Sequence, residues 1–364
     1  MKILHVITSL RIGGAEKLMV DLLPRIKAEG HEVELLLFDG TGTPFRRDIE
    51  NAGIKVFDLG KGGSVYSPLR LLKLMPYLKK YDIVHTHNTA PQLFAAIGSM
   101  LCQVVLCTTE HNTSNRRRGW RWYAAIDRWM YSRYCRVICI SQKAEDNLRK
   151  FIGKSKTHIS TINNGIDLSK YTGASASSEL ESIAPGSRKI IMVAGFRWEK
   201  DQDTLIRTLT KLPEQFHLFL VGDGVRRAQL EALTKELSLE DRVHFLGLRT
   251  DVPNLLHAAD YVVMSSHFEG LSLSSVEGMS VDKPFLASDV DGLREVVEGA
   301  GILFPKGDYE ALAGELLKLD SDPNYSRQVA ERCKRRAADF DIDKMVDGYI
   351  DIYRKLINLV SSHR

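Results

Sequence analysis

The order strand, loop, helix, strand occurs twice in this chain, and this repeat constrains the fold more than any other feature. In residues 2–40, a short apolar run is broken at Gly13 and Gly14, leucines then recur at helical spacing, and the apolar run HEVELLLF follows. Residues 188–224 repeat the same order around the polar loop RWEKDQD. Each copy begins a βαβ unit, and such units build parallel sheets with helices on both faces.

A chain of 364 residues exceeds what one hydrophobic core usually accommodates, so two domains are expected. Residues 171–188 are rich in Ser, Ala, Gly and Pro and are interpreted as the linker. Further apolar runs predict strands at 82–86, 104–109, 136–140, 243–246, 260–264 and 284–287. The prediction is an α/β protein of two doubly wound, Rossmann-like domains, at 1–170 and 189–344. Ligands of such sheets bind beyond the carboxyl ends of the strands.

Composition excludes several classes of protein. A hydrophobic fraction of 44% and a charged fraction of 26% are ordinary for a globular chain. The five cysteines form no C-x-x-C pair, so buried reduced thiols are expected instead of a zinc or redox site. The longest apolar run, residues 93–107, is too short to span a membrane and predicts a buried helix followed by a strand. The N-terminal MKILHVITSL has no cleavage site, so we expect a first strand and a cytoplasmic protein.

In the first half, polar residues follow two of the expected strands. Gly13 and Gly14 precede a helix whose N-terminus could receive an anion, although a plain turn is the alternative. His111 follows the strand at 104–109 and is either a structural hydrogen-bonding group or a catalytic one. His85 and His87 point to the same face of a strand, but no third ligand is evident and no metal site is predicted.

In the second half, Arg197 and Lys200 follow a strand and precede a helix, which suits a diphosphate. A solvated loop is the alternative. The VGDG turn at Gly222 lacks a third glycine, so the NAD fingerprint of a dehydrogenase is not met. A D-x-D pattern at 289–291, typical of metal-dependent sugar transfer, discriminates little because 201–203 and 341–343 match it too.

The stretch HFEGLSLSSVEGM places two glutamates eight residues apart. Ser274 and Glu277 have the spacing of a capping box at a helix start. Glu269 precedes that helix and has no such role. Serine hydroxyls and free N–H groups there could hold phosphate, and the two carboxylates could accept sugar or ribose hydroxyls.

With these motifs the chain resembles the family 4 retaining glycosyltransferases, which have the GT-B fold. GGAEK, DIVHTHN, NNGID, EKDQDTLI, VGDG and EGLSLSSVEGM occur in the family's order and spacing, and the E-x7-E pair is its signature. The resemblance implies two domains facing a cleft, with a C-terminal helix at 345–364 that returns to the first domain.

The resemblance also implies roles for particular residues. Glu269 would face the transferred sugar, Glu277 would hold the ribose, and Lys200 would neutralise the donor diphosphate. His111 would contact the donor sugar. The other implied donor-binding residues are Gly13, Gly14, Gly195, Arg197, Gly222, Leu248, Arg249, Gly270, Leu271, Ser272 and Leu273. The family needs no divalent metal and no cofactor, and its donor phosphate takes the acceptor's proton on the same face.

Three departures from the family pattern bear on these roles. Gly195 stands where an arginine is usual, and the nearby Arg197 is its candidate substitute. Ser272 stands where a glycine is usual and adds a hydroxyl near the sugar. Asp291-Gly292 replaces a usual pair of glycines before a late helix.

Residues 115–136 hold seven arginines, six aromatic residues and one acid, Asp127. A basic and aromatic amphipathic helix suits the headgroup level of an anionic bilayer. We expect this stretch to dock the protein on the inner membrane face and to guide a lipid-linked acceptor. The residues of this patch are Arg116, Arg117, Arg118, Trp120, Arg121 and Trp122. The alternative is a helix with buried aromatic rings and a solvated arginine face. Nucleic acid is not an expected partner because the charge is local.

The predicted function is the transfer of a hexose or N-acetylhexosamine from a nucleotide-sugar to a glycan or lipid-diphosphate-linked acceptor. UDP is favoured over GDP or ADP as the nucleotide, and surface polysaccharide synthesis is the expected setting. Two alternatives are a sugar-nucleotide epimerase of the same fold and a catalytically silent nucleotide-sugar-binding scaffold at the membrane.

Overall fold

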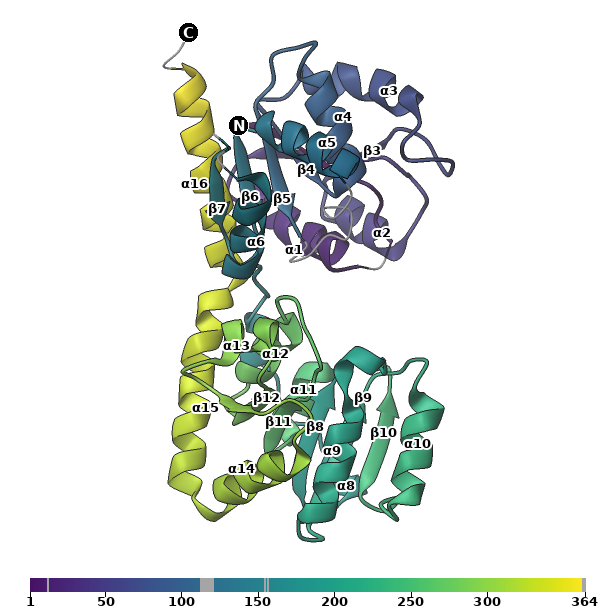
Figure 1. The fold of residues 1–364 in the computed structure, drawn as a ribbon, viewed down its shortest axis with the longest axis vertical. Helices are drawn as coiled ribbons and strands as arrows, with labels where there is room; N and C mark the ends of the chain where they lie inside the picture. Colours follow the sequence, from purple (N-terminus) through teal and green to yellow (C-terminus); the bar gives the residue numbers. More distant parts are fainter. Residues whose placement is uncertain (12, 112–120, 154, 156, 362–364) are drawn as a thin grey trace. The chain divides into compact units, whose positions relative to one another are not determined.

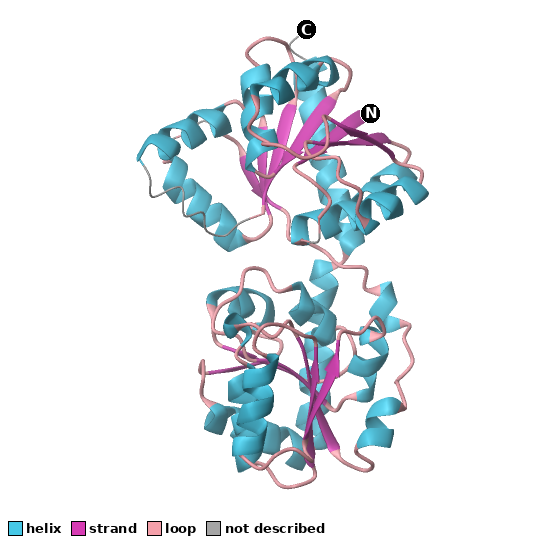
Figure 2. Cartoon of the chain, turned by 90° about the vertical axis from the view of Figure 1, so that its right-hand side faces the viewer, coloured by secondary structure: helices cyan, strands magenta, loops and turns pink. Residues whose placement is uncertain are grey.

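The protein folds into two compact units, each built around a parallel sheet with helices on both faces (Figures 1 and 2). The structure is a computed structural model and describes all residues except 12, 112–120, 154, 156 and 362–364. Unit 1 comprises Met1–Gly165 and Ile342–Arg364, and unit 2 comprises Ile166–Asp341.

The sheet of unit 1 has seven strands in the order β3-β2-β1-β4-β5-β6-β7. The strands are β1 (Lys2–Ile7), β2 (Glu32–Leu37), β3 (Lys55–Asp58), β4 (Ile83–His87), β5 (Leu106–Glu110), β6 (Arg136–Cys139) and β7 (Ile159–Thr161). The strand order reverses between β1 and β4, and this switch point is where ligands of open parallel sheets bind.

Two separate apolar clusters cover the two faces of this sheet. One face packs against α1 (Gly14–Ala28), α2 (Pro44–Asn51) and α16 (Ile342–Ser361). The other packs against α3 (Pro68–Leu78), α4 (Thr89–Gly98), α5 (Arg121–Ser132) and α6 (Gln142–Ile152). The last helix of the chain, α16 (yellow in Figure 1), therefore supplies part of the core of the first unit, including the fully buried Tyr349 and Tyr353.

The sheet of unit 2 has six strands in the order β10-β9-β8-β11-β12-β13. The strands are β8 (Arg188–Val193), β9 (Phe216–Val221), β10 (Val243–Gly247), β11 (Tyr261–Met264), β12 (Phe285–Ser288) and β13 (Ile302–Phe304). Its helices are α7 (Ser169–Thr172), α8 (Glu179–Ile183), α9 (Gln202–Thr208), α10 (Arg227–Glu236), α11 (Val252–Ala258), α12 (Leu273–Met279), α13 (Asp291–Val297), α14 (Tyr309–Ser321) and α15 (Pro323–Ala337). Three short 3-10 helices complete it, at Trp198–Lys200, Leu209–Lys211 and Ala338–Phe340. The switch point here lies between β8 and β11.

The predicted α/β fold is confirmed, and each strand expected from the sequence forms. The apolar run at 93–107 is helix α4 followed by the start of β5. The interpretation of 171–188 as a linker is wrong, because these residues belong to unit 2 and carry α8, whose Leu180 is fully buried. Leu180 and Ala184 are buried within a mostly polar sequence, so no apolar periodicity marks this segment as part of a core.

Two expectations from composition are also tested. No helix among the described residues is long and apolar enough to cross a membrane. Of the five cysteines, which are all unbridged, Cys107, Cys139 and Cys333 are buried. Cys102 is half-buried and Cys135 is exposed, so the expectation of buried thiols is wrong for Cys135.

Candidate active site

In unit 2, the loops that follow β8 and β11 bring Lys200 and Glu269 together. Both loops leave the sheet at its switch point, where adjacent strands run to helices on opposite faces. Lys200 Nζ forms an ion pair with Glu269 Oε1, and Ser266 Oγ donates a hydrogen bond to the same oxygen at 2.8 Å. The two side chains are 23% and 12% exposed, so they remain open to a ligand on one side. Two of the residues predicted to act on the donor, Lys200 and Glu269, thus form one polar centre.

Asp201 fixes the loop that follows β8 and carries Lys200, hereafter the lysine loop. The loop that follows β11 and carries Glu269 is hereafter the glutamate loop. The backbone of Asp201 is left-handed, with φ of 50°, and its side chain is buried. Thr204 Oγ1 donates to its carboxylate at 2.7 Å, and Ser265 Oγ donates to its carbonyl oxygen at 2.8 Å. Burial raises the pKa of Asp201, while the bond from Thr204 and the charge of His267 act in the opposite direction. Since Ser265 belongs to the glutamate loop, this bond holds the two loops in register.

Three aromatic rings that no sequence motif marks lie beside the Lys200–Glu269 pair. The rings of Trp198 and His267 are 4.7 Å apart between centroids, and those of Trp198 and Phe268 are 6.2 Å apart. Trp198 is 60% exposed and Phe268 is 56% exposed. Exposed rings next to a polar centre give it an apolar wall. The only sequence signal for these rings is their position within two residues of Lys200 or Glu269.

Glu277, the second glutamate of the E-x7-E motif, lies half-buried on α12. The predicted capping box is wrong, because α12 begins at Leu273 and Ser274 is already its second residue. Ser272 is the N-cap residue instead, and its hydroxyl accepts a hydrogen bond from Ser275 Oγ at 2.8 Å. Glu277 is therefore not the capping residue of this helix.

Gly292 is required by the packing of the glutamate loop. A Cβ atom added there would lie 1.8 Å from the carbonyl oxygen of Gly270 and 2.4 Å from that of Glu269. No side chain fits at those distances, since both neighbours are backbone atoms. This gives a physical reason for the second residue of Asp291-Gly292. Gly270 itself has open space around its Cβ position.

Arg197 lies beside Gly195, the position at which the resemblance leads us to expect an arginine. A Cβ atom on Gly195 would be 3.9 Å from Arg197 Nε and 3.7 Å from the carbonyl oxygen of Asp223. The Arg197 side chain is exposed and thus passes beside the point from which a side chain at 195 would start.

Gly222 has a steric role that requires no ligand. Its φ is +140°, and a Cβ atom there would lie 2.1 Å from the carbonyl oxygen of Ala194. A Cβ atom added at Gly224 would likewise lie 2.5 Å from the carbonyl oxygen of Phe196. These glycines let the turn after β9 lie against the loop after β8, which holds Arg197 and Lys200.

The Arg249 side chain is occupied within unit 2. It donates to both carboxylate oxygens of Glu179 at 2.7 and 2.6 Å, and to those of Asp251 at 2.8 and 2.7 Å. The bonds to Glu179 and then to Asp251 raise its pKa. The neighbouring Leu248 is 80% exposed. A ligand at this position would meet backbone groups and the leucine, since the guanidinium holds α8.

In unit 1, Gly13 and Gly14 form the start of α1, beside the switch point of the first sheet. Gly13 is the N-cap residue and Gly14 has no atom within 4 Å of its Cβ position. Glu16, in the first turn of α1, accepts a hydrogen bond from Asn88 Nδ2 at 3.4 Å. Asn88 follows β4 with a left-handed φ of 66°. The helix start therefore lies beside the end of β4.

His111 follows β5 and belongs to a group of four histidines. Its Nε2 is hydrogen-bonded to His87 Nδ1 at 2.9 Å, and burial lowers its pKa to about 4. The prediction that His85 and His87 share a face is correct. His5, on β1, lies beside them and was missed, because its partners are distant in the sequence. Its odd-numbered alternation with Ile3 and Ile7 was the available signal.

One ring nitrogen from each of His5, His85 and His87 lies within 4.8 Å of one such nitrogen on the other two. The rings stack nearly parallel, with interplanar angles of 7° to 18°. Lone pairs lie in the ring planes, so parallel rings do not converge on a tetrahedral metal. Each of the six nitrogens has a hydrogen-bond partner. These observations favour a hydrogen-bonded cluster over a metal site.

Part of the predicted membrane patch lies outside the described residues, namely Arg116, Arg117, Arg118 and Trp120, together with the side chain of Arg121. Within α5, Trp122 is 86% exposed and Ile126 is 46% exposed, while Met130 and Tyr131 are buried. The helix thus buries one apolar face and exposes another.

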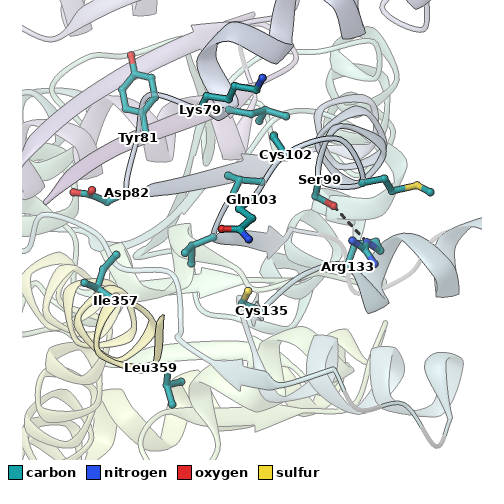
Figure 3. A pocket seen from close by; sticks show the side chains of 14 residues that line it. Lys79, Tyr81, Asp82, Ser99, Cys102, Gln103, Arg133, Cys135, Ile357 and Leu359 are labelled. Atoms are coloured by element: carbon teal, nitrogen blue, oxygen red, sulfur yellow. Dashed lines mark hydrogen bonds between the residues drawn. The ribbon is translucent and has the colours of Figure 1, made fainter. Parts of the chain in front are cut away.

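Unit 1 also contains a hollow that lies away from the buried histidines. Its volume is about 1020 Å³, and Figure 3 shows its lining, where Arg133 Nε donates to Ser99 Oγ at 3.4 Å. Asp82, Val105 and Cys135 line it just before β4, β5 and β6 begin. This hollow therefore lies at the amino ends of the strands, whereas His111 follows the carboxyl end of β5. None of the predicted site residues lines it.

Two family models match the chain. The model described as Glycosyltransferase Family 4 matches residues 12–170, and that described as Glycosyl transferases group 1 matches residues 177–337. The chain belongs to glycosyltransferase family 4. It is therefore a transferase enzyme, and its two parallel-sheet units are those of the GT-B fold.

Individual relatives agree with this assignment. The UDP-Gal:alpha-D-GlcNAc-diphosphoundecaprenol alpha-1,3-galactosyltransferase of Escherichia coli is 25% identical over 308 residues, covering 79% of each chain. The lipopolysaccharide core biosynthesis glycosyltransferase LpsD of Rhizobium meliloti is 26% identical over 97% of this chain and 98% of its own. The solved structure of Anabaena HepE in complex with UDP has a TM-score of 0.86 at 24% identity, covering 98% of this glycosyltransferase and 100% of HepE.

Proposed function

We propose that this glycosyltransferase moves a hexose or N-acetylhexosamine from a UDP-sugar to a lipid-diphosphate-linked glycan, with retention of configuration and without a metal. The observation that carries the proposal is the Lys200–Glu269 pair at the switch point of the second sheet. Relatives support the substrate classes. The name of the Escherichia coli relative specifies UDP-Gal and a diphosphoundecaprenol acceptor, and HepE was solved with UDP and with UDP-glucose.

The chemistry follows from the charges of the pair. Lys200 is a compact cation, and a departing diphosphate gains negative charge as the bond from the anomeric carbon to the phosphate oxygen breaks. The acceptor oxygen bonds to that carbon on the same face, and its proton passes to the departing diphosphate. Before donor binds, Glu269 neutralises Lys200. Donor binding therefore exchanges carboxylate for phosphate at Lys200 and frees Glu269 to accept hydroxyls of the sugar.

The surroundings of the pair supply further contacts in this proposal. Arg197 adds a second cation for the diphosphate, and Glu277 accepts the ribose hydroxyls. Backbone amides of Leu271, Ser272 and Leu273 face the sugar and phosphate, and Leu248 lies against the base. The ring of Trp198 offers an apolar wall for a sugar face.

For the acceptor side, we infer a peripheral site at an anionic membrane. The exposed Trp122 and Ile126 on α5 support it. So does a small apolar cavity of about 300 Å³ next to them, lined by Tyr66, Thr89, Leu93, Tyr123, Ile126 and Asp127. An apolar cavity beside exposed aromatic rings suits an acyl or prenyl chain entering from a bilayer.

Calorimetric titration with UDP, GDP and ADP in EDTA tests the donor side. UDP is expected to bind without metal, and Glu277→Ala is expected to weaken it about tenfold or more, because a charged hydrogen-bond acceptor is lost. The matched control is Glu236→Ala, which removes an exposed helical glutamate on α10. Preference for GDP or ADP would redirect the donor. Failure of the folded protein to bind any of the three would overturn the proposal.

Incubation of UDP-sugars with and without a lipid-diphosphate glycan tests the reaction itself. Product that forms only with acceptor, with the anomeric configuration of the donor, is expected. A changed sugar nucleotide released without acceptor would instead indicate an epimerase.

A further inference from the structure

A continuous chain of hydrogen bonds joins His111 to the buried tyrosines of α16. In order, its members are His111, His87, His5, Tyr353, His85, Thr109 and Tyr349, hereafter the histidine–tyrosine chain. The successive distances are 2.9, 3.0, 3.4, 2.5, 2.8 and 3.0 Å. All of its members lie within unit 1.

The register of the strands brings the members of the histidine–tyrosine chain together. His5 on β1 pairs with His85 on β4, and His87 pairs with Thr109 on β5. Side chains alternate along a strand, so these four residues point to one face. That face packs against α16, which places the Tyr349 and Tyr353 hydroxyls over the imidazoles.

Every imidazole in the histidine–tyrosine chain is neutral at pH 7. Burial lowers the pKa of His5 to about 3 and that of His111 to about 4, and it lowers the pKa of His85 and of His87 well below the usual value. A neutral imidazole has one N–H and one acceptor nitrogen, so a donor on one side requires an acceptor on the other. The whole chain therefore has two ordered states, in which every bond points toward His111 or every bond points away.

Tyr349, the last member of the histidine–tyrosine chain, selects between these two states. Within the described residues, Thr109 Oγ1 is the hydrogen-bond partner that the structure gives to the Tyr349 hydroxyl. A buried phenol with one partner donates to it, since its O–H would otherwise be unpaired. Thr109 then donates to His85 Nε2, His85 Nδ1–H to Tyr353, Tyr353 to His5 Nε2, His5 Nδ1–H to His87 Nε2, and His87 Nδ1–H to His111 Nε2.

We propose that Tyr349 and Tyr353 are positioning residues that hold His111 as its Nδ1–H tautomer. The Nε2 of His111 accepts from His87, so its Nδ1–H is a hydrogen-bond donor for an oxygen of the substrate. This role deepens the proposed function, because it assigns the direction of the bond that His111 makes to a sugar. A free neutral histidine in water favours the opposite tautomer, so the relay has an effect that can be detected.

Nitrogen NMR of the full-length protein labelled at histidine nitrogens tests the proposal without substrate. Long-range proton–nitrogen correlations distinguish the two tautomers, and His111→Asn identifies the His111 signals. The wild type is expected to show His111 protonated at Nδ1. Tyr353→Phe removes the hydroxyl between His5 and His85, so His111 is expected to shift toward Nε2–H or to a mixture. Tyr349→Phe removes the terminal donor and provides a second variant with the same expectation.

Tyr134→Phe is the matched control. Tyr134 is equally buried in unit 1, and its hydroxyl bonds to Thr86 Oγ1 at 2.9 Å and to the carbonyl oxygen of Gln92 at 2.8 Å, outside the chain. Its loss is expected to leave the His111 spectrum unchanged. An Nε2–H His111 in the wild type would overturn the proposal, as would an unchanged His111 in both chain variants. Stoichiometric zinc in the purified protein would overturn it too.

Transfer kinetics link the tautomer to the reaction. Tyr353→Phe is expected to lower kcat about tenfold with KM for the donor changed less than twofold, and Tyr134→Phe to change neither. A protein that shows the Nδ1–H tautomer but binds no nucleotide would contradict the proposed function alone. A protein that transfers sugar with the Nε2–H tautomer would contradict the relay alone.

Discussion

Lys200 and Glu269 form an ion pair, and substitutions of Lys200 distinguish the effect of its charge from that of its side-chain shape. Lys200→Ala removes the cation that we propose faces the diphosphate, and loss of one group that stabilises developing charge typically lowers kcat by about 10²–10³. Lys200→Arg keeps the charge and is expected to retain more activity than the alanine variant. Initial rates of sugar transfer at saturating donor provide the measurement.

Lys211→Ala is the control for this change, because Lys211 pairs with Glu310 at 2.7 Å on the surface of the same unit. It is expected to leave the rate within twofold of wild type. A Lys200→Ala enzyme that keeps more than a tenth of its kcat would exclude this lysine as the main counter-charge of the leaving group.

Gly292 gives a second prediction about a single position. Gly292→Ala places a methyl group against the carbonyl oxygens of Gly270 and Glu269, so the glutamate loop must shift. Overpacking of this kind typically destabilises by about 1–3 kcal/mol. We expect a lower unfolding midpoint in urea and a loss of transfer activity.

Gly314→Ala is the matched control for Gly292→Ala. Gly314 lies in the middle of α14, is exposed, and has no atom within 4 Å of its Cβ position. The same change there is expected to stabilise by about 0.5–1 kcal/mol, because alanine favours the helix. Equal effects of the two substitutions would show that the contact with the glutamate loop is unimportant.

Single residues also show where sequence reasoning ended. Glu269 and Lys200 can be singled out as candidates because both stand in polar loops after apolar strands, where a fold of this class binds ligands. Arg249 was placed in the donor site, yet its side chain holds Glu179 and Asp251, which no local pattern reveals. His5 was missed because only strand register brings it to His85.

Among the helices, α5 is the one on which the proposed membrane docking rests. It buries Met130 and Tyr131 and exposes Trp122 and Ile126. Trp122→Ala combined with Ile126→Ala removes apolar area that would enter the headgroup region, at about 25 cal/mol per Å². We therefore expect the double variant to bind vesicles containing phosphatidylglycerol at least tenfold more weakly in a flotation assay.

Leu317→Ala on α14 controls for a general loss of exposed apolar surface, since Leu317 is 38% exposed in unit 2. Wild-type binding that is the same for neutral and anionic vesicles would count against an anionic membrane surface. Binding unaffected by the double variant would exclude this face of α5.

Whether a strand could be predicted from the sequence depended on its length and its burial. Those with four or more consecutive apolar residues, such as β8 and β9, could be read directly from the sequence. The missed strands β3, β7 and β13 have three or four residues and lie away from the centre of their sheets. Such edge segments gain their conformation from pairing with a neighbour, which periodicity within the segment does not encode.

Each of the two units holds a polar cluster of its own. Unit 2 holds the paired lysine and glutamate, and unit 1 holds the buried histidines, which the last helix of the chain completes. Because α16 supplies Tyr349 and Tyr353 to the first unit, the two ends of the sequence form one core. The histidine cluster therefore depends on segments from both ends of the sequence folding together, and it makes the stability of unit 1 depend on pH.

The sign of this dependence follows from the direction of the shifts. His5, His85, His87 and His111 have lowered pKa values in the folded state, so the unfolded chain binds more protons below its ordinary histidine pKa of about 6.5. Stability is therefore retained at pH 7 and falls as the pH drops from about 6.5 toward 4. For a group that stays neutral when folded, the loss between pH 7 and pH 5 is about 2 kcal/mol.

Several such groups together approach the whole stability of a typical domain, so unit 1 is expected to open in mild acid. Hydrogen exchange at pH 7 and pH 5, corrected for the intrinsic rates and resolved by peptide, measures this unit by unit. Peptides from β4 and α16 should lose protection at pH 5 together, because the histidines of the strand and the tyrosines of the helix share one hydrogen-bonded chain. Protection of α16 that is independent of pH would mean that these imidazoles are charged or solvated in the folded protein, and would remove the basis for a neutral relay.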